Sequence, residues 1–208
     1  MNPLDHLATA LGRRDEAPNQ ELAKRLVATK DKKAVKILAE NIDHIDKAIR
    51  SDVIKTLYEI GEREPALIAD YADVFLKLLK DKNNRLVWGA MTALDYIAAI
   101  NPKGIHKHLA LIMEVSDKGS VITKDHAMGI LTKLAGQKEY SNQALTILLD
   151  QMKFSATNQL PKYAEEALPV ISAKFKKEFH QVLSKRLSDY EDSPKKRRLE
   201  KVLKKLSN

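Results

Sequence analysis

The apolar positions of the chain repeat at an interval of 37 residues. Each repeat has apolar residues spaced by four and then three, which places them on one face of a helix. A small residue follows and lets a neighbouring helix approach. In the stretch 84–100 this series is Ala90, Leu94, Ile97 and Ala98. The equivalent series are Val53, Leu57, Ile60 and Gly61; Ala127, Leu131, Leu134 and Ala135; and Ala164, Leu168, Ile171 and Ser172, with Val202 and Leu206 continuing after one extra residue.

A second helical series precedes each of these, so that each repeat is a pair of helices, here called the A helix and the B helix. The A-helix series, also spaced by 37, is Leu38, Phe75, Ile112 and Leu149. Asn101-Pro102 and Ser193-Pro194 are typical helix starts and support the division. We therefore predict five pairs, at about 32–62, 65–100, 102–136, 138–173 and 174–207.

The ends of the pattern give further expectations. Two short helices, about 3–11 and 20–30, are expected to cap the N-terminal end, the second with Asn19 as its N-cap. Pro169 falls inside the fourth B helix, where a missing amide donor predicts a kink. The predicted core consists of Leu57, Leu94, Leu131 and Leu168 with Phe75, Ile112 and Leu149.

Helix pairs of this kind cannot bury their apolar faces alone, so we expect them to stack and share a continuous core. The pattern resembles HEAT repeats, whose B helix opens with an aspartate turn, a Val-Arg pair, and then Ala and Leu at core positions. The matching residues are Asp46, Ile49-Arg50, Val53 and Leu57; Asp81, Leu86-Val87, Ala90 and Leu94; and Thr123-Lys124, Ala127 and Leu131, while Val87 and Pro161 depart at the basic position.

The resemblance covers residues 32–207 and implies an all-α fold. That fold is an α-α superhelix, a HEAT-like (armadillo-like) solenoid of about five helix pairs plus N-terminal capping helices. We expect one domain over 1–208, with a cap at 1–31, four repeats at 32–173 and a basic C-terminal repeat at 174–208. A coiled coil is the structural alternative, but breaks at intervals of about 37 residues argue against it.

Composition narrows the function classes. Hydrophobic residues make up 44% and charged residues 31% of the chain, as in ordinary soluble domains, and cysteine is absent, which excludes disulfides and thiolate zinc sites. The N-terminus does not have the pattern of a signal peptide and no stretch predicts a membrane span, so a cytoplasmic protein is expected. The net charge of +8 divides into +2 over residues 1–156 and +6 over residues 157–208.

The HEAT resemblance implies that B helices line a concave groove, and the positions beside their core stripe are the first candidate site. Trp88, Asp125 and Lys162 are equivalent by the 37-residue shift and are expected to form a row. The alternative is that the aromatic residues only pack between repeats. The candidate groove residues are Trp88, Thr92, Tyr96, Asp125, His126, Lys133, Lys162 and Tyr163, with Gly89 and Gly129 beside them.

The C-terminal sequence SPKKRRLEKVLKKLSN is the second candidate site. It holds seven basic residues and one acidic residue. One interpretation is an electrostatic patch for phosphate backbones or acidic proteins. The other is a solvated terminal helix whose cations suit a helix C-terminus. The candidate basic patch is Lys195, Lys196, Arg197, Arg198 and Lys201.

The chain has no sequence motif for catalysis, phosphate-loop binding or metal binding. We therefore expect a non-enzymatic scaffold for a protein or peptide, with no cofactor, no metal and no membrane partner. The second hypothesis is a nucleic-acid-binding protein that uses the C-terminal repeat, remotely similar to the HEAT-like DNA glycosylases. Those enzymes use a Trp and an Asp one helical turn apart, with an Arg from the next repeat. Here Thr92 follows Trp88 by four residues, and the equivalent of Trp88 in the next repeat is Asp125.

Overall fold

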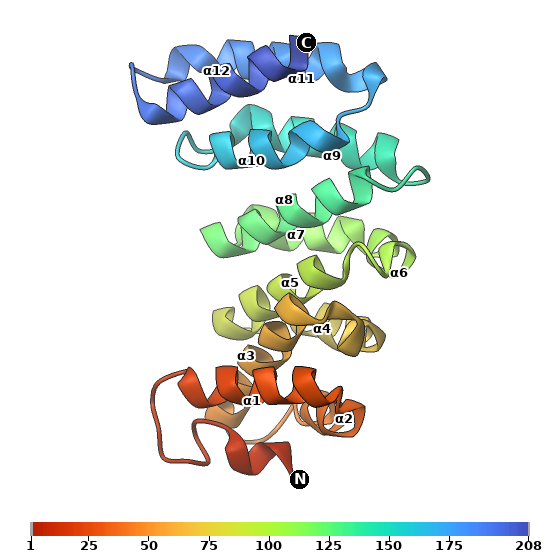
Figure 1. Cartoon of the computed structure of the whole chain (residues 1–208), viewed down its shortest axis with the longest axis vertical. Coiled ribbons are helices and arrows are strands. Elements are labelled where there is room, and N and C mark those ends of the chain that lie inside the picture. The colour runs from red at the N-terminus through yellow and green to blue at the C-terminus, as the bar shows by residue number, and fades with distance from the viewer. Residues whose placement is uncertain (1, 208) are drawn as a thin grey trace. The chain divides into compact units, whose positions relative to one another are not determined.

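The computed structural model describes residues 2–207, which contain twelve α-helices and no β-strand (Figure 1). The chain divides into two compact units, Met1–Ala127 and Met128–Asn208, with the boundary inside one helix, α8 (Val121–Ala135). Over these described residues, every helix is too short or too polar to cross a bilayer. The prediction of an all-helical repeat fold is confirmed, while the prediction of a single domain stays a prediction.

The first unit is built from the predicted helix pairs. Its elements are η1 (Pro3–His6), α1 (Ala17–Thr29), α2 (Lys32–Glu40), α3 (Lys47–Arg63), the 3₁₀ turns η2 (Pro65–Leu67) and η3 (Ala69–Tyr71), α4 (Ala72–Leu78), α5 (Asn84–Ile97), α6 (Pro102–Lys107), α7 (Leu109–Lys118) and the first part of α8. The A helix of the third repeat is therefore two helices, α6 and α7, separated at His108.

The second unit contains the rest of α8 and two further pairs. Its elements are α9 (Ser141–Phe154), α10 (Leu160–Ala167), η4 (Leu168–Val170), η5 (Ala173–Phe175), α11 (Lys176–Arg186), η6 (Leu187–Asp189) and α12 (Pro194–Ser207). Several helices start at a residue whose side chain accepts a hydrogen bond from the first turn. Asp31, Asp46, Asn83 and Asn101, for example, each accept a hydrogen bond from a backbone N–H of the first turn.

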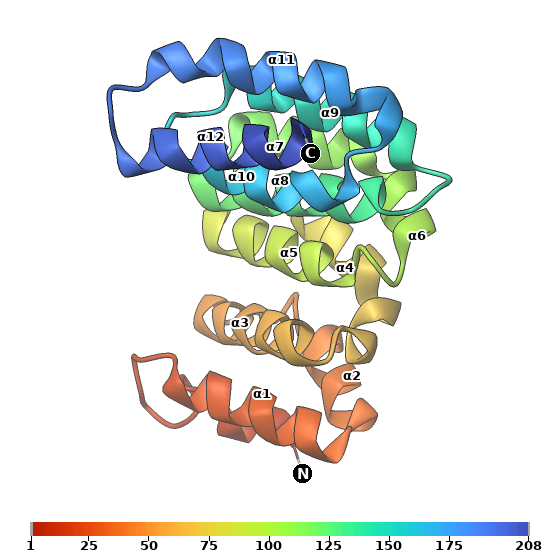
Figure 2. The same cartoon turned by 45° about the horizontal axis from the view of Figure 1, so that its top comes forward.

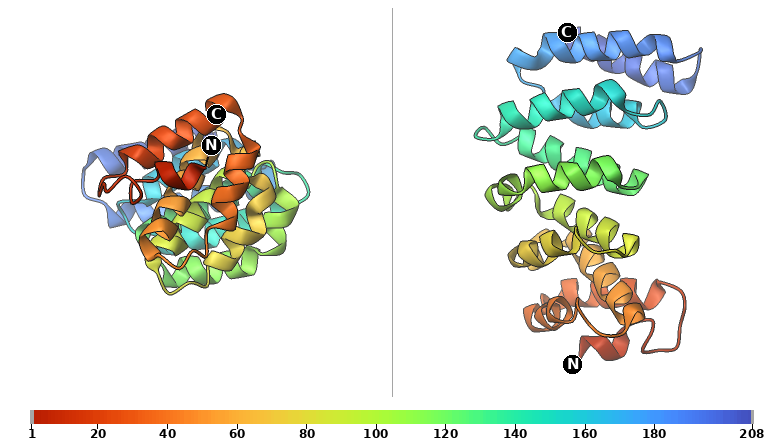
Figure 3. Two further views of the ribbon diagram at one scale, coloured as in Figure 1. Left: turned by 90° about the horizontal axis from the view of Figure 1, so that it is seen from below. Right: turned by 180° about the vertical axis from the view of Figure 1, so that it is seen from behind.

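Each unit has two layers. In the first unit the B helices α3 and α5 lie side by side, and α1 packs on the other side of α3 as a further member of that layer (Figure 2). In the second unit α10 packs against α12 and α9 packs against α11. The view from behind in Figure 3 shows α9 and α11 on the near side of this unit. The apolar faces of the helices meet between these layers.

The predicted core is confirmed at most positions. Leu57, Leu94 and Leu131 of the B helices have no solvent exposure. The same holds for the A-helix residues Phe75, Ile112 and Leu149. These side chains bury the apolar stripe that the 37-residue interval predicts, so the repeat in the sequence corresponds to a repeat in packing.

The N-terminal prediction is wrong in two respects. Only Pro3–His6 is helical, as a 3₁₀ turn, and no helix spans 3–11. The reason is that the amides of Ala8 and Thr9 donate to side chains, those of Asn19 and Asp52, instead of to helix carbonyls. Asn19 is also not an N-cap: α1 begins at Ala17, and Asn19 lies inside it, fully buried.

The prediction at Pro169 is also corrected. The α-helix α10 ends at Ala167 and a 3₁₀ turn follows at Leu168–Val170, so the chain has a helix end where a kink was expected. Pro169 has no amide hydrogen to continue the α-helical bonding. Leu168 is the first residue of this turn, and this predicted core residue is only half-buried.

Candidate binding surfaces

Aromatic side chains gather on the B helices of the first unit. The rings of Tyr58 on α3 and Trp88 on α5 are 5.9 Å apart between centroids, at a tilt of 51°. The rings of Tyr96 on α5 and His126 on α8 are 6.3 Å apart, edge to face. All four side chains are half-buried, so each keeps part of its ring at the surface. We call Tyr58, Trp88, Tyr96 and His126 the aromatic surface.

Two glycines let these rings pack closely on the neighbouring helix. A Cβ at Gly89 would lie 2.7 Å from Cγ1 of Ile54 and 3.6 Å from a ring carbon of Tyr58. A Cβ at Gly61 would lie 3.4 Å from a ring carbon of Tyr96, beside a closer contact with Ile68. Gly89 therefore serves the close packing of α5 on α3.

Burial and nearby negative charges alter the acidity of Tyr96. Burial, together with negative charges nearby, raises the pKa of Tyr96 to about 12. The carboxylates that raise this pKa are those of Glu62, Asp95 and Glu59. Oδ2 of Asp95 also lies 2.8 Å from Nδ1 of His126. The aromatic surface is thus bordered by acidic groups, although the chain as a whole is basic.

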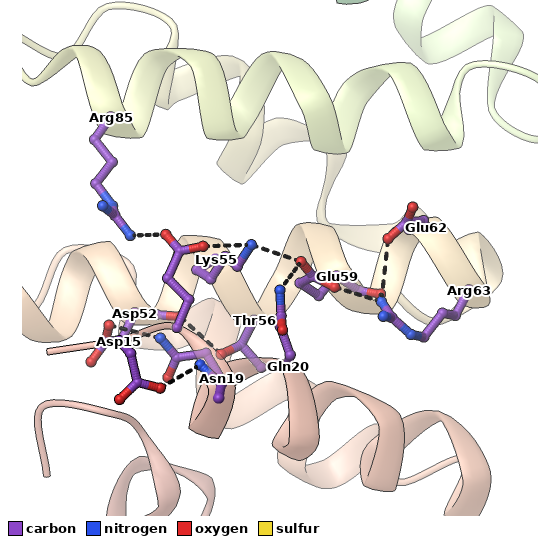
Figure 4. A network of polar contacts seen from close by, with 12 residues as sticks. Asp15, Asn19, Gln20, Asp52, Lys55, Thr56, Glu59, Glu62, Arg63 and Arg85 are labelled. Atoms are coloured by element: carbon purple, nitrogen blue, oxygen red, sulfur yellow. Dashed lines mark hydrogen bonds and ion pairs between the residues drawn. The ribbon is translucent and has the colours of Figure 1, made fainter. Parts of the chain in front are cut away.

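A chain of ion pairs runs beside the aromatic surface and joins three helices (Figure 4). Arg85 of α5 pairs with Glu16 at the start of α1, at 2.6 Å. Glu16 pairs with Lys55 of α3 at 2.8 Å, and Lys55 pairs with Glu59 at 2.7 Å. Arg63 then reaches Glu59 at 2.7 Å. Lys55 and Glu59 are buried, so this network fixes α1, α3 and α5 relative to one another.

The network also determines the protonation states of Lys55 and Glu59. Burial alone would lower the pKa of Lys55, but its hydrogen bonds with Glu16 and Glu59 outweigh that effect and raise the pKa. Burial alone would raise the pKa of Glu59. Hydrogen bonds from Lys55 and Arg63 outweigh it and hold the pKa below the ordinary 4.5. Both groups are therefore charged in the folded protein at neutral pH.

The structure narrows the predicted groove within the first unit. Trp88 and Tyr96 belong to the aromatic surface, and so does His126. Thr92 is 5% exposed, and its hydroxyl donates to the carbonyl of Trp88 within α5, so its side chain does not present itself to a ligand. Asp125 is half-buried on α8.

The other predicted groove residues belong to the second unit. Lys133 is half-buried, Lys162 is exposed, and Tyr163 is only 4% exposed. The row of Trp88, Asp125 and Lys162 extends over both units and stays a prediction.

The predicted basic patch lies on α12. Lys195 and Lys201 are exposed, and Lys196 is half-buried. Arg197 pairs with Asp192 at 3.2 Å, and Arg198 forms a two-pronged pair with Glu165 of α10 at 2.8 and 2.5 Å. Arg198 is therefore both a surface cation and part of the contact between α10 and α12.

The sequence pattern does not identify Tyr58 of the aromatic surface or the neighbouring ion pair of Lys55 and Glu59. Tyr58 lies one residue beyond the core stripe of its helix, and nothing in the apolar pattern marks it. Lys55 and Glu59 are four apart, a spacing typical of helix ion pairs, and this was the available indication. Their distant partners Glu16 and Arg85 could be found only from the fold.

Comparisons with known proteins agree on the fold. No protein-family model matches the chain, and no curated protein shows significant sequence similarity to it. Among solved structures, a designed armadillo repeat protein in complex with peptide (KR)4 has a TM-score of 0.66 and 16% identity, over 91% of this chain and 87% of that chain. Computationally designed armadillo repeat proteins for modular peptide recognition give a TM-score of 0.65 and 17% identity, over 88% and 85%.

A natural protein is also similar. The archaeal HEAT-like repeats protein from Thermococcus onnurineus NA1 has a TM-score of 0.53 and 16% identity, over 93% of this chain and 97% of that chain. Sequence identity this low carries no information about ligand or activity. The helix pairs, their 37-residue interval and these structural likenesses together show that the chain has an armadillo/HEAT-like helical repeat fold.

Proposed function

We propose that the protein is a non-enzymatic scaffold that binds a partner protein through an extended peptide segment bearing Lys or Arg side chains. The proposed site is the aromatic surface of the first unit. The observation that carries the proposal is the set of half-buried rings on neighbouring B helices, bordered by carboxylates.

The chemistry of this surface favours a cationic side chain. Aromatic faces attract ammonium and guanidinium groups, and a carboxylate nearby adds charge pairing. Nζ of the buried Lys55 lies 4.8 Å from the ring centroid of Tyr58, so this ring already contacts a cation of the protein itself. Near Tyr96, Glu62 is an exposed carboxylate that can pair with a cationic side chain of a partner, whereas Asp95 is buried and bonded to His126.

The repeat fold supports a peptide as the ligand. Side-by-side B helices present equivalent positions at regular intervals, which suits an extended chain with side chains at regular intervals. One structurally similar designed protein is in complex with peptide (KR)4, and others were designed for peptide recognition. The proposal assigns no chemical step to His126, because its Nδ1 is engaged by Asp95 and its ring by Tyr96.

Trp88 is the only tryptophan of the chain, so its fluorescence reports directly on this surface. We expect peptide (KR)4 to shift the emission of Trp88 and to reduce its quenching by acrylamide. A length-matched acidic peptide (ED)4 is expected to do neither. The affinity of labelled (KR)4 is measured in parallel by fluorescence anisotropy, which does not depend on Trp88.

Variants of the surface test the contacts. Glu62→Gln removes one exposed carboxylate, and Tyr96→Leu keeps apolar bulk while removing the aromatic face. A cation–π contact of about 0.5–2 kcal/mol predicts that Tyr96→Leu weakens the affinity about 2- to 30-fold. Phe154→Ala removes an aromatic ring that is 84% exposed in the second unit and serves as the matched control. Equal affinity of the wild type for (KR)4 and (ED)4, or an unchanged affinity in both surface variants, would contradict the proposal.

A further inference from the structure

The terminal helix α12 carries a basic face that the peptide-binding proposal does not use. Its apolar residues Leu199, Val202 and Leu206 are buried against the rest of the second unit. A helix turns by 100° per residue, so five basic residues fall on the remaining sides of α12 in one continuous sector of about 120°. This basic face consists of Arg197, Arg198, Lys201, Lys204 and Lys205.

Much of this charge is not neutralised. Arg197 and Arg198 have carboxylate partners, Asp192 and Glu165. Within the described part of the second unit, no carboxylate forms an ion pair with the exposed Lys201, Lys204 or Lys205. The one acidic residue of the helix, Glu200, lies outside the basic sector.

The two units differ greatly in charge. Residues 128–208 contain 16 basic and 9 acidic residues, a net charge of +7. Residues 1–127 contain 20 basic and 19 acidic residues, a net charge of +1. The positive charge of the chain therefore belongs almost wholly to the unit that carries α12.

A cavity of about 310 Å³ opens beside the basic face, between α10 and α12. Arg198, Lys201 and Lys205 line it together with a single carboxylate, that of Glu165. Its volume equals that of roughly ten water molecules, which leaves room for a hydrated phosphate group. The apolar floor is provided by Leu168 and Val202.

The chemistry of the face distinguishes between the classes of anionic partner. A protein interface normally needs exposed apolar or aromatic anchors, and the large exposed hydrophobic residues of the described chain all lie outside α12. A bilayer would need an exposed apolar stripe, and that of α12 is buried. A phosphodiester backbone needs only cations and donors.

The length of the basic face also matches the spacing of phosphates along a nucleic-acid strand. From Arg197 to Lys205 the helix rises by about 12 Å, which equals the axial length of about three to four phosphates of one strand. We propose that the basic face of α12 binds the phosphodiester backbone of nucleic acid, without reading base sequence. This site is independent of the aromatic surface, which belongs to the other unit and consists of different residues.

Salt dependence tests the proposal directly. The affinity of the full chain for a labelled duplex and for a labelled single strand of mixed sequence is measured by anisotropy between 50 and 200 mM salt, about the range over which such contacts change affinity strongly. The triple variant Lys201→Gln, Lys204→Gln, Lys205→Gln removes three exposed cations. We expect the slope of log affinity against log salt to fall by about 2.7 on the duplex or about 2 on the single strand.

A matched control separates the face from the net charge. Lys174→Gln, Lys176→Gln, Lys177→Gln removes the same charge from three exposed lysines, one in η5 and two at the start of α11. We expect this control to keep most of the slope, and the variant Glu62→Gln to leave nucleic-acid binding unchanged. Circular dichroism verifies that each variant keeps its helix content.

Four outcomes would overturn the inference. They are no salt-dependent binding by the wild type, an unchanged slope in the α12 variant, equal losses in both triple variants, or binding to anionic vesicles or (ED)4 but not to nucleic acid. Failure of this test leaves the peptide proposal standing, because the two sites use different residues and opposite ligand charges.

Discussion

Replacing Asn19 by Ala is expected to destabilise the first unit by about 2–4 kcal/mol. The side chain of Asn19 is fully buried and makes two hydrogen bonds. Its Oδ1 accepts from the amide of Ala8 at 2.9 Å, and its Nδ2 donates to Asp52 at 2.8 Å. The first bond is worth about 0.5–1.5 kcal/mol and the second, to a charged group, about 1.5–3 kcal/mol.

The structure also predicts where this loss appears. The amide of Thr9 donates to the other oxygen of Asp52, at 2.7 Å, and does not touch Asn19. In native-state hydrogen exchange, Asn19→Ala should therefore expose the amide of Ala8 more than that of Thr9. Because the chain has two units, this residue-resolved assay is more informative than a single unfolding midpoint.

Two controls define the result. Asn142→Ala removes an exposed Asn from α9 in the second unit and should change stability by no more than about 0.5 kcal/mol. The double variant of Asn19 and Asp52 should show a coupling of about 0.5–3 kcal/mol. The reasoning is refuted if the amide of Ala8 in Asn19→Ala keeps the protection that it has in the wild type.

Three further predictions concern the core, the packing of α5 and the response to acid. Leu94→Ala should cost about 2–5 kcal/mol in urea unfolding and Leu168→Ala clearly less, because only Leu94 is fully buried; the reverse order would contradict this difference in burial. Gly89→Ala should destabilise despite the better helix propensity of alanine, because its Cβ would meet Ile54 at 2.7 Å, and a higher midpoint would refute this contact. The pKa of Glu59 in the folded protein lies below 4.5, so its ionic contribution to the free energy of unfolding is present above pH 4.5 and is lost as the pH falls through the folded pKa. The loss of stability in Glu59→Gln should therefore be smaller at pH 3 than at pH 7. An equal loss at both pH values would contradict this.

The sequence predicts the repeat well because packing at the repeat positions is local and periodic. Leu57, Leu94 and Leu131 occupy equivalent places in equivalent helices, so one interval locates all three. The pattern fails where a long-range contact decides the local structure. Asparagine is a common N-cap residue. Asn19 is nevertheless buried in the core, where its side chain donates a hydrogen bond to Asp52, 33 positions away. Pro18, in the first turn of α1, was the better indication of where that helix begins.

The binding surfaces were predicted less completely. Trp88 and Tyr96 were identified from their places beside the core stripe, but their partners Tyr58 and Asp95 come from ring contacts and charges between helices. Thr92 has the same place in the pattern, yet it is buried by its neighbours. Whether a position beside the stripe is open depends on the size of the side chains around it, and a periodic pattern does not contain that information.

The ion-pair network of the first unit has a consequence for how such a chain changes by duplication. An apolar core built on a 37-residue interval accepts an extra helix pair, since each new pair presents the same leucine face. An insertion between α3 and α5 would nevertheless separate Arg85 from Glu16, which lie 2.6 Å apart, while Lys55 would keep both Glu16 and Glu59. The leucine core therefore accepts repeats in any order. The ion pairs, in contrast, require α1, α3 and α5 to be neighbours in this order. Insertion of further repeats is favoured outside these three helices.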